Sequence, residues 1–426
     1  MQEQTWPGLE WHFMKRNSVF FAVFMGIAIC ARAQAPTGSI EGAKQDAIDA
    51  YLQPLANNHT FAGAVTLVAN EDRVVSVKAV GYRDLASKAP MTTDDLFWIA
   101  STSKPMTATA LMMLVDEGKV NVDDPVEKYL PEFHGQMVSV AAAGSTGSAQ
   151  GAAGGQTLVP ANHSILVREI LSHTSGLPFK SKAQPGALDM LPLKDAVRSF
   201  AAEPLNFQPN TNYSYSNEGL NTAARIIEVV SGISYEQFMQ ERLFDPLGMK
   251  DTTFWPTAEQ IGRLAKTYKL DAQKEDLVEG PIEQLTYPLD DRKHRYPMPA
   301  GGIFSTAGDV ARFARMVLNG GVLDGRRYLS AQSLQEMTSV ENGGMGGGDY
   351  GFGFSISAHG MGHGGAYSNA MEIDRETGRV MIFMVQQNGP WGTEEGKKIV
   401  PTLDRLADEL VRSGAAASAS MEQGKH

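Results

Sequence analysis

The chain has 426 residues, 42% hydrophobic and 20% charged, which is typical of a globular protein with a large core in one or two domains. Its net charge of −11 disfavours binding to nucleic acid or anionic lipid, because both are negatively charged. The single cysteine, Cys30, lies in a segment that we expect to be removed, so disulfides and thiol catalysis are excluded in the mature protein.

Residues 1–33 have the pattern of a secretory signal peptide. Lys15 and Arg16 are a basic start, and residues 19–30 are an apolar run too short to cross a bilayer comfortably. Ala31-Arg32-Ala33 matches a cleavage site. We therefore expect an exported protein, periplasmic or secreted, with no membrane segment after cleavage. A retained membrane anchor is the alternative.

The periodicity of apolar residues after position 40 predicts strands, then many helices, then strands and a last helix. A sheet built from both ends of the chain, with a helical insertion between them, fits this order. Pro54 should break or end the first helix. The expected helices are 41–57, a segment from Ser101 to Gly118, 165–172, 217–230, 234–244, 306–319 and 402–411, and the expected strands are 64–69, 74–80, 350–356, 370–373 and 379–385.

Two segments contain too few apolar side chains to bury. Residues 138–157 are nearly all Ala, Gly, Ser, Thr and Gln, which predicts a flexible surface loop, with a mobile lid as the alternative. Residues 414–426 are small and polar, which predicts a disordered tail. Between the signal peptide and this tail we expect one domain, residues 34–413.

The first candidate catalytic pair is Ser101 and Lys104, in the order Ser-x-x-Lys. On a helix this spacing places both side chains on one face. A serine hydroxyl is a weak nucleophile and needs a neighbouring base, which a lysine one turn along can supply. Pro105 is tolerated only in the first helical turn, so Ser101 should lie at a helix N-terminus, where a developing anion is favoured.

A second candidate is Tyr215-x-Asn217, directly before a predicted helix. A tyrosine is a poor base unless a nearby cation favours the phenolate, and Lys104 is the candidate cation. The Asn217 amide can bind a substrate carbonyl and Lys104. A packed turn tyrosine and a helix-capping asparagine are the alternative.

The third candidate is the glycine-rich run Gly362-His363-Gly364-Gly365-Ala366. Glycine lets a backbone lie against a ligand, so a strand edge here can present an N–H group to an oxyanion. A glycine-rich hairpin with a surface histidine is the alternative. The chain has no Gly-x-Ser-x-Gly, no His-Glu-x-x-His and no glycine-rich phosphate loop, and we expect no metal and no cofactor.

Together, Ser101-x-x-Lys104, Tyr215-x-Asn217 and His363-x-Gly365 resemble the active site of the penicillin-recognising serine hydrolases. The second motif resembles the class C-related branch, which includes class C β-lactamases, family VIII esterases, D-aminopeptidases and DD-peptidases. The resemblance covers about residues 45–410 and includes the flanking stretches 171–176, 245–249 and 299–302.

The resemblance implies an α/β fold of the α+β type. A central antiparallel sheet from about residues 41–100 and 301–413 would lie beside an all-helical region, about 101–300, with the site between them. It also implies that Ser101 is acylated, that Lys104 keeps Ser101 and Tyr215 poised, and that Tyr215 takes the serine proton. Asn217 would hold the acyl side of the substrate, and the N–H groups of Ser101 and Ala366 would form the oxyanion hole.

The third motif departs from class C β-lactamases, which carry Lys-Thr-Gly where this chain has His363-Gly364-Gly365. A neutral imidazole binds a carboxylate less well, although a protonated one can bind it. We therefore expect an enzyme that hydrolyses a small ester, amide or D-amino-acid peptide through an acyl-enzyme. A class C-like β-lactamase is the first alternative, and a non-catalytic, acylated sensor or binding module is the second.

Overall fold

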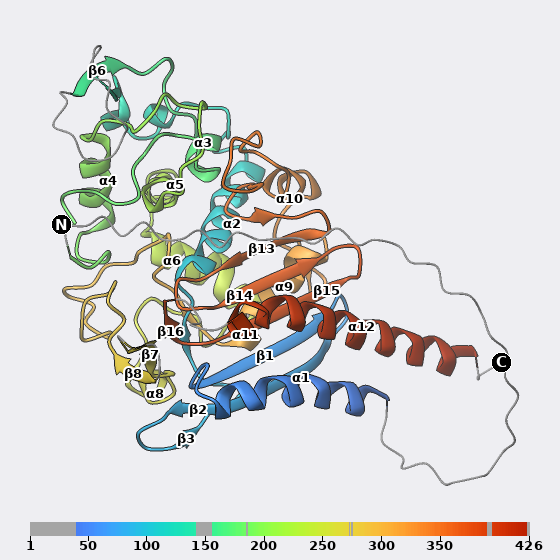
Figure 1. The fold of residues 1–426 in the computed structure, drawn as a ribbon. Helices are drawn as coiled ribbons and strands as arrows, with labels where there is room; N and C mark the ends of the chain where they lie inside the picture. The colour runs from blue at the N-terminus through green and yellow to red at the C-terminus, as the bar shows by residue number, and fades with distance from the viewer. Residues whose placement is uncertain are drawn as a thin grey trace, which may run out of the picture.

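The computed structural model describes residues 40–141, 156–184, 186–271, 273, 276–389 and 394–423. The expected signal peptide, residues 1–33, lies outside the described residues. The described chain forms a large antiparallel sheet with helices on both of its faces, and a second, mainly helical part beyond it (Figure 1). This arrangement matches the predicted fold class.

The large sheet takes its strands from the two ends of the chain, as predicted. Its spatial order is β12-β13-β14-β15-β1-β2-β3, and every neighbouring pair is antiparallel. The strands are β1 (Gly63–Asn70), β2 (Val74–Asp84), β3 (Ala89–Pro90), β12 (Ser355–Ile356), β13 (Gly360–Gly364), β14 (Ala370–Asp374) and β15 (Arg379–Met384).

Strand β15 shows how the sheet separates two cores. Its side chains alternate, so Val380 and Ile382 join the core on one face, while Met381 and Phe383 join the core on the other. On the second face α1 (Ile40–Asn57) and α12 (Ile399–Gln423) lie side by side, and α9 (Ala307–Leu318) covers the first (Figure 1).

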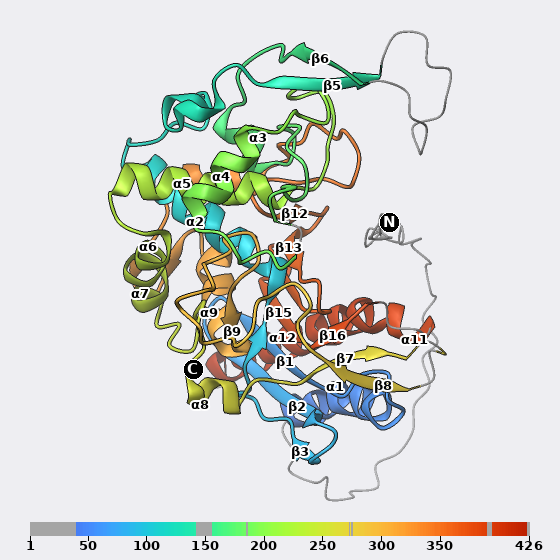
Figure 2. The same ribbon diagram turned by 90° about the vertical axis from the view of Figure 1, so that its left-hand side faces the viewer.

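The mainly helical part begins at α2 and lies beyond the α9 side of the sheet (Figure 2). Small strand pairs accompany it: β4–β9, β5–β6, and β10–β11 near α9. A three-stranded group, β16-β7-β8, lies near the β2 side of the large sheet instead (Figure 2). The helices of the mainly helical part are α2 (Ser103–Asp116), α3 (Val167–Leu171), α4 (Leu193–Ala201), α5 (Asn217–Ser231), α6 (Tyr235–Met239) and α7 (Asp245–Leu247), whereas α8 (Ala258–Gly262) lies near β2 and β3 (Figures 1 and 2). The remaining elements are β4 (Phe97–Trp98), β5 (Met137–Ala141), β6 (Gln156–Pro160), β7 (Thr267–Leu270), β8 (Leu277–Gly280), β9 (Phe304–Ser305), β10 (Val322–Leu323), β11 (Arg326–Arg327), β16 (Gln387–Asn388), α10 (Ala331–Met337) and α11 (Glu394–Lys397).

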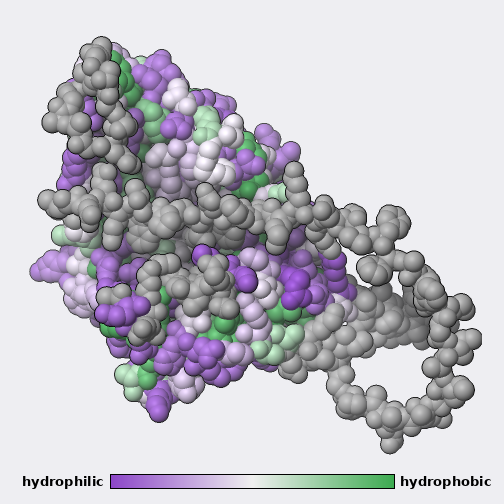
Figure 3. Space-filling view, viewed as in Figure 1, coloured by the Kyte–Doolittle hydropathy of each residue, from purple (hydrophilic) through white to green (hydrophobic). Residues whose placement is uncertain are grey.

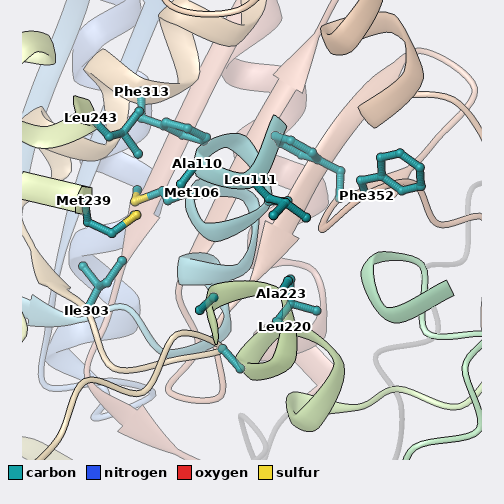
Figure 4. Packing of buried hydrophobic residues seen from close by; sticks show 14 of the residues in the cluster. Met106, Ala110, Leu111, Leu220, Ala223, Met239, Leu243, Ile303, Phe313 and Phe352 are labelled. Atoms are coloured by element: carbon teal, nitrogen blue, oxygen red, sulfur yellow. The ribbon is translucent and has the colours of Figure 1, made fainter. Parts of the chain in front are cut away.

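Helix α2 is the central element of the core. Its residues from Ser103 to Leu114 are all buried, and helices α5, α6 and α9 surround it (Figure 4). Met106 and Ala110 pack among side chains from these helices, including Leu220 and Phe313. Replacing a buried residue here with a smaller one would leave a cavity, which typically costs about 2–5 kcal/mol for a large-to-alanine change. The helix is therefore a rigid support for the residues at its N-terminus.

The structure corrects four of the sequence predictions. Helix α1 continues through Pro54 to Asn57. Of the expected strand 350–356, only Ser355 and Ile356 are in a strand, because the chain reverses direction over residues 351–354 and Tyr350 forms a bridge with Ser355. The ends of the expected loop 138–157 pair as β5 and β6, and its middle lies outside the described residues. Helix α12 reaches Gln423, so the expected tail, residues 414–426, is helical as far as Gln423, and residues 424–426 lie outside the described residues.

The surface in Figure 3 is mixed. Hydrophilic residues predominate over the described part of that face, and hydrophobic residues form small separate groups. None of the helices in the described part of the chain is both long and apolar enough to cross a membrane.

Candidate active site

Ser101 lies where strand β4 turns into helix α2. Strand β4 pairs with β9, and a single 3-10 turn, Ala100–Thr102, leads into α2. Ala100 has a φ of 45°, a left-handed conformation that is unfavourable for a residue with a side chain. From Asp95 to Leu114, Ser101 is the one residue that is not fully buried. The turn thus presents this hydroxyl, and no neighbouring side chain, at the surface of the core.

The Lys104 amine lies at the centre of the site and is completely buried. Its Nζ lies 3.0 Å from Ser101 Oγ, 2.7 Å from Asn217 Oδ1 and 2.8 Å from the carbonyl oxygen of Ala300. The first two motifs of the sequence therefore meet at this amine. Within the described ranges, none of the hydrogen-bond partners of this amine is a carboxylate.

Burial without a carboxylate partner lowers the pKa of Lys104 well below its usual value, because desolvation penalises the charged form. A neutral amine has two N–H donors and one lone pair. Asn217 Oδ1 and the Ala300 carbonyl can only accept hydrogen bonds, whereas the Ser101 hydroxyl can donate one. The Ser101 hydroxyl can also accept, so the three contacts fit an ammonium that donates to all three oxygens, and, once the amine is neutral, a lone pair that faces Ser101.

The Ala300 carbonyl is held in place from two sides. The backbone N–H of the same residue, Ala300, donates a hydrogen bond to Asn221 Oδ1 on α5, 3.0 Å away. The preceding carbonyl, of Pro299, accepts a hydrogen bond from Thr107 Oγ1 on α2 at 2.7 Å. The stretch 299–302 was noted in the sequence only as a flanking match, and the structure places it against Lys104.

Tyr215 lies beside both residues. Its hydroxyl hydrogen-bonds with Ser101, and Lys104 Nζ lies 4.6 Å from the centre of its ring. Burial raises the pKa of Tyr215 far above its usual value, and this effect outweighs the hydrogen bond with Ser101, which lowers it. Desolvation therefore disfavours the expected phenolate and the charged lysine beside it in the resting protein, because it penalises both charges.

Asn217 is the first residue of α5, and its position follows from local capping. Ser216 is the N-cap, and its Oγ accepts a hydrogen bond from the N–H of Gly219 at 3.2 Å. The Ser216 hydroxyl also donates to the Pro178 carbonyl at 2.6 Å. The next residue, Glu218, is fully buried, and burial raises the pKa of its carboxyl to about 9, so it is neutral at pH 7.

His363 lies on β13 and is buried, with 5% of its surface exposed. Its Nδ1 lies 2.7 Å from the Gly364 carbonyl, so it carries the proton, and Nε2 accepts a hydrogen bond from Tyr350 Oη at 3.0 Å. Burial, with the charge of Lys104 as a lesser cause, lowers the pKa of His363 to about 3. A protonated His363 that binds a substrate carboxylate, an option left open by the sequence, is not supported, because the ring is neutral and both nitrogens are occupied.

The end of β13 lies against the turn that carries Ser101. Thr102 Oγ1 donates to the His363 carbonyl at 3.4 Å. A Cβ at Gly365 would lie 2.5 Å from the Ile99 carbonyl oxygen, so only glycine fits this approach. Ala366 follows in the turn after β13. The structure therefore brings all three motifs to one place.

Two further residues of this site were missed in the sequence. His173 and Tyr350 are both buried, and their ring centres are 4.6 Å apart. Both contact Tyr215, with ring centres 4.5 Å and 6.5 Å away. The stretch 171–176 was a signal for His173, but nothing near Tyr350 pointed to the site. Among the described residues, no group of three or more His, Cys, Asp or Glu side chains could hold a metal ion.

This fold and this site define a hydrolase class with the β-lactamase architecture. The chain matches the family model described as Beta-lactamase over residues 48–400, and it belongs to that family. It is 33% identical to Protein Rv1367c of Mycobacterium tuberculosis (strain H37Rv) over 303 residues, 68% of this chain and 71% of the relative. It is 26% identical to Esterase EstB of Burkholderia gladioli over 375 residues, 79% of this chain and 89% of the relative.

The fold has a close structural match in EstCE1, described as a hydrolase with promiscuous acyltransferase activity. The TM-score is 0.69 at 21% identity, and the match covers 87% of this chain and 99% of that one. The predicted family resemblance and fold class are thus confirmed.

Proposed function

We propose that this protein is an exported serine hydrolase that acts on small ester or amide substrates through an acyl-enzyme on Ser101. The observation that carries the proposal is the 3.0 Å contact between Ser101 Oγ and the buried Lys104 Nζ, at the start of a rigid helix. A serine hydroxyl is activated by an adjacent base, and burial lowers the pKa of Lys104, which favours the form of the amine that can accept the serine proton.

The mechanism follows from two pKa shifts. Desolvation lowers the pKa of Lys104, which favours an amine that can accept a proton, and raises the pKa of Tyr215, which favours a hydroxyl that can donate one. Ser101 Oγ attacks the substrate carbonyl carbon while the Lys104 amine accepts the hydroxyl proton. The neutral Tyr215 hydroxyl donates a proton to the leaving oxygen or nitrogen and regains one from Lys104. Water then attacks the acyl-enzyme and releases the acid and free Ser101. This differs from the expected roles in that Lys104, not Tyr215, accepts the proton first.

The carbonyl oxygen of the substrate becomes negatively charged when Ser101 attacks, and hydrogen-bond donors are needed to stabilise it. The Ser101 N–H lies in the first turn of the helical segment, where N–H groups lack helical acceptors, and the Ala366 N–H lies beyond β13. One oxyanion donor is worth about 3 kcal/mol where it has been measured. Asn217 Oδ1 accepts from Lys104, which leaves the amide NH₂ to bind the acyl side of a substrate.

Charge at the site favours uncharged substrates. Of the Lys and Arg side chains in the described ranges, only Lys104 makes a recorded contact with Ser101, Tyr215 or Asn217, and it is buried. His363 is neutral. These described residues therefore offer a substrate carboxylate no exposed cationic partner, which disfavours a β-lactamase and favours an esterase or an amidase for D-amino-acid derivatives. The relative named Esterase EstB agrees with this choice.

A substrate panel tests the proposal. We expect many turnovers of p-nitrophenyl acetate or a D-alanyl anilide. We expect kcat/KM for nitrocefin to be about 10–100-fold lower than for the better of these two, the value of an unmade bond to a charged group. A reaction that stops after one equivalent would identify the acylated sensor, and faster nitrocefin hydrolysis would identify a β-lactamase.

Export has a separate test. The cleavage pattern at residues 31–33 supports a mature N-terminus at or near Gln34. N-terminal sequencing of protein collected from outside the cytoplasm should find it there. Exported material that retains Lys15 would indicate a membrane anchor.

A further inference from the structure

His173 lies in the turn after α3 with an unusual backbone. Its φ is 62°, a left-handed conformation that is uncommon for a residue other than glycine. Only 1% of its surface is exposed. Because a strained, buried residue persists only when its surroundings hold it, its contacts indicate what the strain achieves.

Two of those contacts are hydrogen bonds to the backbone on either side of Tyr215. The His173 carbonyl accepts the N–H of Ser214 at 3.0 Å, and His173 Nδ1 accepts the N–H of Ser216 at 3.2 Å. One residue thus holds the backbone on both sides of Tyr215. The left-handed conformation lets its carbonyl and its side chain meet the same short segment.

The imidazole also contacts the Tyr215 ring directly. The two ring centres are 4.5 Å apart at an angle of 46°, and Tyr350 lies at 4.6 Å from the imidazole. Since Nδ1 accepts a hydrogen bond, the proton of the neutral ring is on Nε2. Burial lowers the pKa of His173, so the ring stays neutral and Nδ1 remains an acceptor. Tyr215 is therefore held by its neighbours' backbone and by its ring.

We propose that His173 is a positioning residue that fixes the Tyr215 hydroxyl beside Ser101 and Lys104. This inference rests on the proposed function, because it assigns to His173 the alignment of a proton-transfer group. It does not require His173 to contact substrate. A misplacement of about 1 Å in such a group can cost about 10²-fold in rate.

Two substitutions at position 173 test whether the hydrogen-bond acceptor Nδ1 is what positions Tyr215. Glycine and asparagine both tolerate the left-handed backbone, but only His173→Asn keeps an acceptor, since Oδ1 is bonded to Cγ as Nδ1 is. We expect His173→Gly to lower kcat about 10²-fold with KM nearly unchanged, and His173→Asn to recover at least 10-fold of that loss. His59→Gly is a matched control, because His59 has a φ of 56° and contacts Asp276 on the surface.

A double-mutant cycle with Tyr215→Phe separates positioning from general loss of structure. If His173 acts through the Tyr215 hydroxyl, His173→Gly should cost less than about 3-fold more in the Tyr215→Phe background. Additive losses, or equal kcat for the Gly and Asn variants, would overturn the inference. If His173→Gly does not fold, His173→Phe, which keeps a ring but has no acceptor, replaces it in the cycle.

The rate at which a fluorophosphonate labels Ser101 provides a second readout. It reports the activation of Ser101 even if no substrate in the panel turns over, so failure of the proposed function is distinguishable from failure of this inference. The Tyr215 hydroxyl also hydrogen-bonds with Ser101 and so orients the attacking oxygen, and we therefore expect His173→Gly to label about 10-fold more slowly or worse and His59→Gly to label at the wild-type rate. Equal labelling of all variants would contradict the role of His173.

Discussion

Ser101→Ala should abolish turnover and leave the fold intact. Removing a catalytic serine hydroxyl costs on the order of 10⁶-fold in kcat in a serine protease, and we expect a loss of about 10⁴–10⁶-fold here. The melting temperature should change little, because Ser101 is partly exposed and Lys104 keeps its contacts with Asn217 and Ala300. Hydrolysis of a p-nitrophenyl ester and thermal unfolding of the same samples measure both quantities.

The identity of the nucleophile can be read from the adduct itself. Mass spectrometry after fluorophosphonate treatment should find one modified peptide, the one that contains Ser101. Ser103→Ala is the matched control, because Ser103 is only two residues away but is buried and donates to the Ala100 carbonyl at 2.6 Å. It should still form the adduct. An active Ser101→Ala protein, or an adduct on another peptide, would disprove the acyl-enzyme mechanism.

Lys104→Met should cost at least as much activity as Tyr215→Phe, and the two losses should not add. For Tyr215→Phe we expect a loss of about 10²–10⁴-fold in kcat, the range for general acid–base groups, with little change in melting temperature. Lys104→Met removes the proton acceptor, and it also leaves Asn217 Oδ1 and the Ala300 carbonyl without their donor. An unmet buried hydrogen bond costs about 1–3 kcal/mol, so this variant should also melt earlier.

The pH profile distinguishes the two candidate bases. If neutral Lys104 is the base, kcat/KM should fall as the pH decreases through its lowered pKa, because the protonated amine cannot accept a proton. His363 does not contribute a limb near neutrality, since its pKa is about 3, and the pKa of His173 is also lowered by burial. Tyr215→Phe should keep this acidic limb. A limb that persists in Lys104→Met, or disappears in Tyr215→Phe, would assign the base role to another group.

The sequence by itself determined the elements whose signals are local. Helix α2 was predicted from apolar spacing, with Gly118, at a φ of 68°, just beyond its end, and α9 from Thr306, whose Oγ1 accepts the N–H of Asp309. Strands β1, β2, β14 and β15 were predicted from short apolar runs bounded by turns. The three motifs were recognisable for the same reason, because each spans only a few residues. The prediction of one continuous strand over residues 350–356 was wrong, because the chain reverses direction over residues 351–354, which are buried.

Only the tertiary structure decided the electrostatics of the site. Lys104 and Tyr215 were expected to be a charged pair, but Lys104 is fully buried, Tyr215 is half-buried, and no carboxylate of the described residues contacts the amine, so desolvation lowers the pKa of the lysine and raises the pKa of the tyrosine. His363 was considered as a possible ligand for a substrate carboxylate, but in the structure its ring nitrogens are hydrogen-bonded to the Tyr350 hydroxyl and the Gly364 carbonyl. Burial depends on every segment packed around a group, and the Ala300 carbonyl reaches Lys104 across 196 positions of sequence. A local pattern specifies which residue types are present, whereas their charges depend on solvent that only the complete fold excludes.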